Sequence, residues 1–97
     1  MKLVYTRRAA RDLKDISDFL TPRSRQGARN VRDAILGSIE DLLRFPRIGR
    51  LQTTGDVRKL VVSRYPYHVF YTADTGGGEI RIITVRHAAR QSGYSNL

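Results

Sequence analysis

The stretch RIITVRHAARQSGY, residues 81–94, places proton carriers and cations directly after an apolar run. His87 belongs to the residue type whose ordinary pKa lies nearest neutrality, and the hydroxyl of Tyr94 is a second group that can donate or accept a proton. Arg86 and Arg90 flank this histidine and suit bidentate contacts with phosphate or carboxylate. Such a set would support metal-free cleavage of RNA, in which the 2′-hydroxyl attacks its own phosphate beside a base, an acid and cations.

Two further arginines, Arg58 and Arg64, flank a neighbouring predicted strand. They would hold the scissile phosphate if strand pairing brings their edge beside the end of the last strand. The alternative for His87 is a structural one, in which a half-buried ring merely ends a strand. His68 lies among core-like residues, and we expect it to pack or to form a hydrogen bond with a neighbour.

Other classes of reaction find less support in the composition. The chain contains no Cys and two His, so we expect neither a disulfide framework nor a zinc site, and no metal or cofactor. Asp56, Asp74 and Glu79 are the only carboxylate side chains after Pro46, too few for a magnesium cluster. No G-x-S-x-G motif or triad spacing is present, which disfavours nucleophilic catalysis.

Length and charge describe a small basic protein. The 97 residues suffice for one domain, 1–97, and Lys plus Arg number 18 against 9 Asp plus Glu, a net charge of +9. Such a surface attracts phosphate or an acidic protein, and it would also suit a plain basic nucleic-acid-binding module. The N-terminus does not resemble a signal peptide and no run reaches membrane-spanning length, so we expect a cytoplasmic protein with no membrane partner.

Hydrophobic spacing predicts a short strand over residues 2–5 followed by two helices. Thr6 is the expected N-cap of the first helix, which ends at the Thr-Pro pair 21–22. Ser24 is the expected N-cap of the second helix, which ends near the Phe-Pro pair 45–46. Because the connection between the two helices is short, they are expected to form an antiparallel hairpin.

Three runs rich in β-branched and aromatic residues follow, VRKLVV, YHVFYTA and EIRIITV. The glycine-rich loop 74–79 joins the last two, so consecutive hairpins give an antiparallel meander. In the last strand we expect Ile80 and Ile82 to point one way and Ile83 and Val85 the other, which makes this strand internal. The predicted fold class is α+β, with the N-terminal strand and the helix hairpin packed on one face of a small antiparallel β-sheet.

The order of these elements, with FPRIGR after the second helix and HAAR at residues 87–90, resembles the RelE/ParE superfamily of toxins from type II toxin–antitoxin systems. The resemblance covers essentially the whole chain, and HAAR is similar to the HGAR or HGRR ending of ParE-like members, also named plasmid stabilisation proteins. It implies a growth-inhibiting toxin that a cognate antitoxin neutralises. The antitoxin is expected on the exposed side of the helix hairpin, in contact with Arg8, Arg11, Arg29 and Arg32.

Two mechanisms occur within this superfamily. RelE-like members cleave mRNA on the ribosome, whereas ParE-like members bind DNA gyrase and hydrolyse nothing. For a RelE-like mechanism the resemblance implies catalytic roles for His87, Arg90, Tyr94, Arg64 and Arg58. For a ParE-like mechanism it implies a target-binding surface of Arg58, Arg86, His87, Arg90 and Tyr94.

The cations that follow the second helix bear on this choice. RelE-like members carry an early pair of catalytic lysines, but between Pro46 and Asp56 this chain has only Arg47 and Arg50 as cations. Arginine binds phosphate but keeps its proton, so it cannot replace lysine in proton transfer. The resemblance therefore favours gyrase inhibition, with ribosome-dependent mRNA interferase activity as the alternative.

Overall fold

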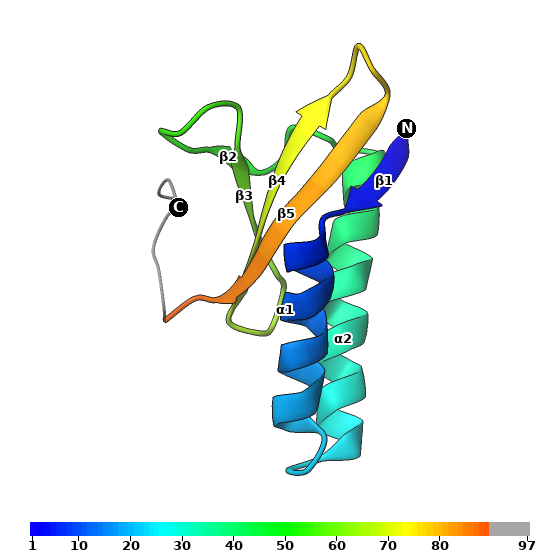
Figure 1. Cartoon of the computed structure of the whole chain (residues 1–97), viewed down its shortest axis with the longest axis vertical. Coiled ribbons are helices and arrows are strands. Elements are labelled where there is room, and N and C mark those ends of the chain that lie inside the picture. The colour runs from blue at the N-terminus through cyan, green and yellow to red at the C-terminus, as the bar shows by residue number, and fades with distance from the viewer. Residues whose placement is uncertain (90–97) are drawn as a thin grey trace.

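The computed structural model describes residues 1–89, in which two helices pack on a five-stranded sheet (Figure 1). The elements are β1 (Lys2–Tyr5), α1 (Arg7–Leu20), α2 (Arg25–Glu40), the 3-10 helix η1 (Asp41–Leu43), β2 (Arg50–Leu51), β3 (Arg58–Val61), β4 (Tyr67–Asp74) and β5 (Glu79–His87). The strand order is β1-β5-β4-β3-β2, which confirms the α+β class and the internal position of β5. Within residues 1–89, neither the length nor the hydropathy of any helix would allow it to span a membrane.

The sheet is mixed. β3, β4 and β5 form the predicted antiparallel meander. β1 joins the sheet as well and runs parallel to β5, with Leu3 beside Ile80 and Tyr5 beside Ile82. The predicted antiparallel sheet is therefore extended by one parallel edge strand. The short β2 at the other edge was not predicted, because two residues carry no periodic pattern.

Both helices begin at the predicted caps. The hydroxyl of Thr6 accepts a hydrogen bond from the Ala9 N–H at 3.0 Å, and the hydroxyl of Ser24 accepts one from the Gly27 N–H at 2.9 Å. These bonds satisfy N–H groups that have no partner within the first helical turn. Figure 1 shows that the resulting antiparallel hairpin extends well beyond the end of the sheet.

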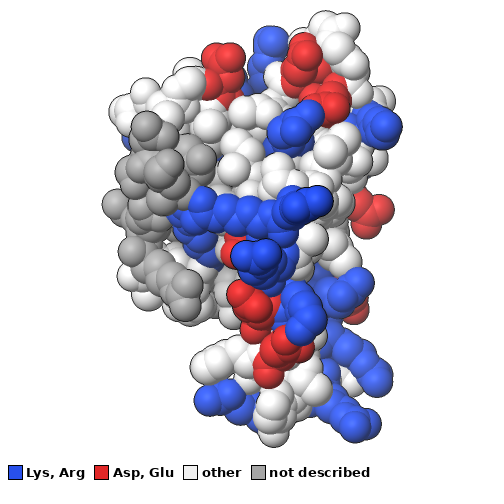
Figure 2. Space-filling view, in the orientation of Figure 1, with Lys and Arg blue, Asp and Glu red and all other residues white. Residues whose placement is uncertain are grey.

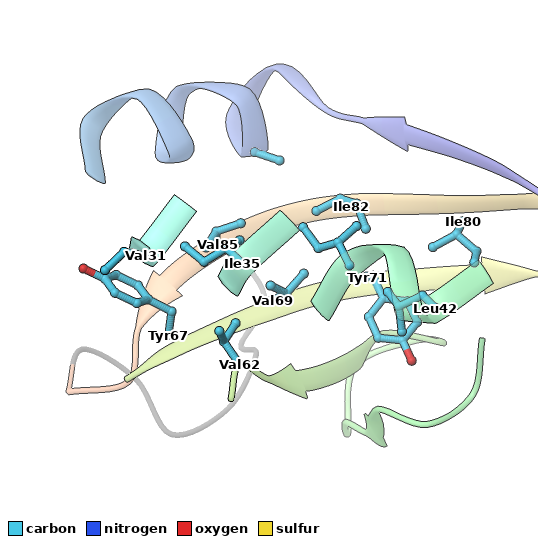
Figure 3. Packing of buried hydrophobic residues seen from close by; sticks show 12 residues of the cluster. Val31, Ile35, Leu42, Val62, Tyr67, Val69, Tyr71, Ile80, Ile82 and Val85 are labelled. Carbon is cyan, nitrogen blue, oxygen red and sulfur yellow. The ribbon is translucent and has the colours of Figure 1, made fainter. Parts of the chain in front are cut away.

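The core lies between the hairpin and one face of the sheet. The cluster of buried residues consists of Ala9, Val31, Ile35, Ile39, Leu42, Val62, Tyr67, Val69, Tyr71, Ile80, Ile82 and Val85. In Figure 3, Ile35 and Leu42 point from the helical layer toward the strands. Tyr67 begins β4, and Tyr71 lies four residues further along the same strand.

A bulge in β5 overturns one expectation about side-chain direction. The pairing of β4 with β5 shifts between Thr84 and Ile82, which leaves Ile83 as an extra residue in β5. One extra residue reverses the alternation of side chains beyond it. Val85 therefore joins Ile82 in the core, and the prediction that Val85 points to the opposite face was wrong.

Candidate functional site

The side chains of Thr6 and Asp12 hold the end of β5 through hydrogen bonds to its free edge. β1 pairs only with the first half of β5, so the second half has a free edge toward α1. The hydroxyl of Thr6 donates to the Ile83 carbonyl at 2.7 Å. The carboxylate of Asp12 accepts hydrogen bonds from the Val85 N–H at 3.0 Å and from the Thr84 hydroxyl. These bonds satisfy edge groups and fix α1 against the strand that ends at the candidate site.

A groove of about 480 Å³ opens between α1 and this end of the sheet. Its walls are formed by Asp12, Asp15, Ile16, Phe19, Tyr67, Val85, Arg86 and His87. The ring of His87 is exposed and lies edge-to-face with the ring of Tyr67, with 5.3 Å between their centroids. Its Nδ1 accepts a hydrogen bond from the Ala89 N–H at 3.1 Å. The groove thus places an imidazole, a phenol and a guanidinium beside two carboxylates.

Two residues of this groove were not indicated by the sequence. Tyr67 pairs with His87 across the β4–β5 register, a contact that only strand pairing creates. Burial raises the pKa of the Tyr67 hydroxyl above its ordinary value, so it keeps its proton at neutral pH. Asp12 follows Arg8 by four residues, a spacing that suggests a surface ion pair and gives no sign of a bond to β5.

Arg86 and Arg64 both lie at the His87 end of the sheet. Arg86 is 8% exposed, and its guanidinium carbon lies 5.4 Å from the centre of the Phe70 ring. Arg64 is exposed in the turn before β4 and has a positive φ of 77°. That turn lies beside the end of β5, since the Ala88 N–H donates to the Pro66 carbonyl at 2.7 Å and Tyr67 pairs with His87. The structure therefore brings these two arginines to the predicted end of the sheet.

Arg58 lies elsewhere. β4 separates its strand from β5, and Arg58 pairs with Tyr71, toward the end of the sheet away from His87. Its Nη1 donates to the carbonyl of Gly49 at 2.9 Å and to that of Arg47 at 3.2 Å. Strand pairing therefore does not bring Arg58 beside the end of β5, which was the condition for it to hold a phosphate next to His87. Arg90 and Tyr94 lie outside the described residues.

The four arginines expected to contact an antitoxin are all exposed on the helix hairpin: Arg8, Arg11, Arg29 and Arg32. Arg29 and Arg32 line a hollow of about 360 Å³ between the helices. Arg32 also lines a neighbouring hollow of about 450 Å³ together with Leu13 and Leu36. Figure 2 shows Lys and Arg gathered over the half of the molecule that holds the helices, with fewer acidic residues between them.

His68 precedes the core residue Val69 in β4 and packs edge-to-face with Phe70, with 6.4 Å between the ring centroids. Its Nδ1 is buried and forms no hydrogen bond within residues 1–89. Burial lowers the pKa of His68 below its ordinary value, and the positive charges of Lys59 and His87 lower it further. The predicted packing role of this residue is thus confirmed.

Comparisons with known proteins agree with this geometry. The family described as ParE toxin of type II toxin-antitoxin system, parDE, matches residues 3–92. Toxin RelE2 of Caulobacter vibrioides is 36% identical over 90 residues, which cover 92% of this chain and 97% of that protein.

Solved structures share the fold. A chain of the chromosomal ParDE system from P. aeruginosa superposes with a TM-score of 0.76 at 27% identity, covering 90% of this chain and 95% of that one. The isolated RelE toxin of E. coli superposes with a TM-score of 0.67 at 20% identity, covering 92% and 85%. The match over residues 3–92 decides the family, and the chain belongs to the ParE toxins of type II toxin–antitoxin systems, within the RelE/ParE superfamily.

Proposed function

We propose that this toxin arrests growth by binding and inhibiting DNA gyrase, and that a cognate antitoxin neutralises it. The observation that carries the proposal is the charge of the groove beside His87. The carboxylates of Asp12 and Asp15 line that groove. Arg86 lines the same groove, so a phosphate brought to the imidazole would meet two carboxylates against one cation, a balance that would weaken RNA binding and oppose the further charge that develops during cleavage.

The arginines of the described chain support the same proposal. Metal-free RNA cleavage needs cations aimed at the scissile phosphate. The guanidinium of Arg58 donates to carbonyl groups at the other end of the sheet, and that of Arg86 lies over the Phe70 ring. Both arginines therefore support the fold, whereas a phosphate site would need them turned toward His87.

The alternative is a ribosome-dependent mRNA interferase. It is favoured by one feature of the site, since the exposed imidazole of His87 and the protonated hydroxyl of Tyr67 share one groove. It is also favoured by the name of the relative from Caulobacter vibrioides, a RelE toxin. Because the same residues would serve both mechanisms, activity assays are needed to distinguish gyrase inhibition from mRNA cleavage.

Two assays on the purified chain test the proposal. We expect inhibition of plasmid supercoiling by DNA gyrase, and intact mRNA after incubation with translating ribosomes. Arg90→Ala is expected to weaken gyrase inhibition by about 1 kcal/mol, because a charged contact is lost, while Tyr94→Phe has little effect because no proton is transferred. Cutting of mRNA at A-site codons that disappears with His87→Ala would overturn gyrase inhibition in favour of the interferase.

The antitoxin is proposed to lay an amphipathic helix over the hollows that Arg29 and Arg32 line, with its carboxylates on these arginines. Reversing one charge, in Arg32→Glu, should weaken the complex, and the loss should shrink as salt rises. Arg81→Glu makes the same change of charge on β5 and serves as the control. Equal affinities of the two variants for the antitoxin, measured by calorimetry, would exclude this docking site.

A further inference from the structure

A second surface lies far from His87, in the segment that follows the helices. We call residues 43–51 the loop surface. Eight large hydrophobic residues among residues 1–89 are exposed, and four of them belong to this segment: Leu43, Phe45, Ile48 and Leu51. Their exposed fractions range from 42% to 62%. Monomeric proteins seldom leave apolar side chains gathered in this way, and such groups commonly mark an interaction site.

Two of these exposed apolar residues, Phe45 and Ile48, line a hollow of about 500 Å³. It is lined by Arg44, Phe45, Pro46, Arg47, Ile48 and Thr75. Arg44 lies over the ring of Phe45, with 5.3 Å between the guanidinium carbon and the ring centre. Residues 42–55 contain three arginines and no acidic residue. The hollow therefore complements a partner that presents an apolar side chain flanked by carboxylates.

The backbone of the loop surface is held by hydrogen bonds with Tyr71 and Arg58. The hydroxyl of Tyr71, which is fully buried, donates to the Pro46 carbonyl at 2.8 Å and accepts from the Gly49 N–H at 2.9 Å. Arg58 donates to the carbonyls of Arg47 and Gly49. A loop held by these four hydrogen bonds is already ordered before a partner arrives, which lowers the entropic cost of binding.

The loop surface and the His87 groove lie at opposite ends of the sheet. Tyr67 begins β4 beside His87, and Thr75, which follows the last residue of β4, lines the hollow of the loop surface. Along β4, Tyr67 beside His87 is separated from Thr75 by roughly 25 Å at about 3.3 Å per residue. The loop surface is therefore a site of its own.

We propose that the loop surface is the docking site for an acidic segment of the target protein, whose apolar side chain fills the hollow beside Phe45 and Ile48. This rests on the proposed function in one respect, namely that the target is gyrase. Single-stranded nucleic acid would require aromatic platforms for its bases, whereas three of the four exposed apolar residues here are aliphatic. A central apolar anchor surrounded by arginines is typical of protein hot spots.

A matched pair of substitutions tests the proposal. Ile48 and Val61 are each 62% exposed, and Val61 lies in β3 outside the loop surface. We expect Ile48→Ala to weaken binding to immobilised, purified DNA gyrase by about tenfold, and Val61→Ala to change it by less than about twofold. Arg47→Ala keeps the backbone carbonyl that Arg58 binds, and should weaken binding most at low salt.

Failure of the gyrase target and failure of the loop surface give different results. Wild-type chain that does not bind gyrase contradicts the proposed target, and the loop surface is then judged by growth arrest at equal expression. Ile48→Ala chain that arrests growth, or binds gyrase, as strongly as wild type overturns the loop surface. Binding to a duplex DNA oligonucleotide is measured in parallel. If Arg47→Ala weakens only that binding while Ile48→Ala changes nothing, the surface contacts nucleic acid and the inference fails.

Discussion

The two ends of the sheet use the same residue type in different ways. Tyr71, at the loop end, is fully buried and its hydroxyl bonds to two backbone groups of the loop. Tyr67, at the other end, lines an open groove and packs edge-on against the exposed His87 ring. Burial raises the pKa of both hydroxyls, so both stay protonated at neutral pH. The tyrosine at the loop end is thus enclosed and hydrogen-bonded to the loop, whereas the tyrosine at the His87 end lines an open groove.

The charges at the two ends also differ. The loop surface carries Arg44, Arg47 and Arg50, and its hollow is lined by no acidic residue. The charged residues that line the groove at the His87 end are Asp12, Asp15 and Arg86, together with His87 itself. A negatively charged partner is therefore attracted to the loop end, whereas at the other end it meets two carboxylates of its own sign beside the single cation of Arg86. The net positive charge of the chain therefore does not by itself indicate where an acidic target binds.

The largest effect is expected from a substitution of Gly49, which lies against Tyr71 at the loop end. A Cβ at this position would lie 2.7 Å from the Tyr71 Cε1 and hydroxyl oxygen and 3.0 Å from the Lys59 carbonyl. We expect Gly49→Ala to lower the free energy of unfolding by about 3 kcal/mol, since the contact overpacks the site and displaces the Tyr71 hydrogen bonds. Urea unfolding measures this loss.

The same substitution elsewhere gives the control. Gly37 lies in α2, and a Cβ there would meet nothing within 4 Å. Because alanine is the better helix former, Gly37→Ala should raise the free energy of unfolding by up to about 1 kcal/mol. A Gly49→Ala chain as stable as the wild type would show that the loop end is not closed around Tyr71.

Removing single hydroxyls sharpens the contrast between the tyrosines. Tyr71→Phe leaves the Gly49 N–H and the Pro46 carbonyl without their partner, and should cost about 2 kcal/mol of stability. The pKa of Tyr67 is shifted by burial alone, so Tyr67→Phe should cost less than about 0.5 kcal/mol. Chemical denaturation of both variants gives the comparison. Equal losses of stability in the two variants would mean that the two hydroxyls stabilise the fold to the same extent.

The brace at the His87 end is Asp12. Asp12→Ala removes the acceptor of the Val85 N–H and of the buried Thr84 hydroxyl, and is expected to cost about 1.5 kcal/mol of stability. Asp15→Ala removes a carboxylate from the same groove without these bonds and is the control. Hydrogen exchange of the Val85 amide should rise in the first variant alone. Unchanged exchange in Asp12→Ala would contradict the role assigned to this carboxylate.

The smallest effect is expected from the titration of His68. Its pKa is lowered in the folded chain, so the unfolded chain takes up a proton first as pH falls. The contribution of neutral His68 to stability is therefore present above its ordinary pKa of 6.5 and is lost as pH falls through the lower folded value. Unfolding measured between about pH 7 and 5.5 should show this loss in wild type and less of it in His68→Gln. A His68→Gln chain with the wild-type pH dependence would refute this assignment.

Local spacing predicted every helix and strand except η1 and β2. It predicted the starts of the helices better than their ends, since α2 ends at Glu40 and not near residues 45–46. Thr6 and Ser24 cap the two helices as predicted, and the periodic runs gave the meander with β5 inside the sheet. These features depend on residues a few positions apart, since a cap bonds within one helical turn and a strand alternates every second residue. Local spacing in the sequence records such contacts directly. It also placed His87 at the end of a strand.

Contacts between residues far apart in the chain became visible in the folded structure alone. The parallel pairing of β1, the bulge at Ile83 and the bond between Asp12 and Thr84 join parts of the chain far apart, 72 residues in the last case. The Arg58 guanidinium was expected near phosphate but is held by the carbonyls of the loop. No spacing within the sequence encodes these contacts, because each depends on strand order and on the register of the completed sheet. The charge of the His87 groove is set in the same way, by a helix that folds back across the end of β5.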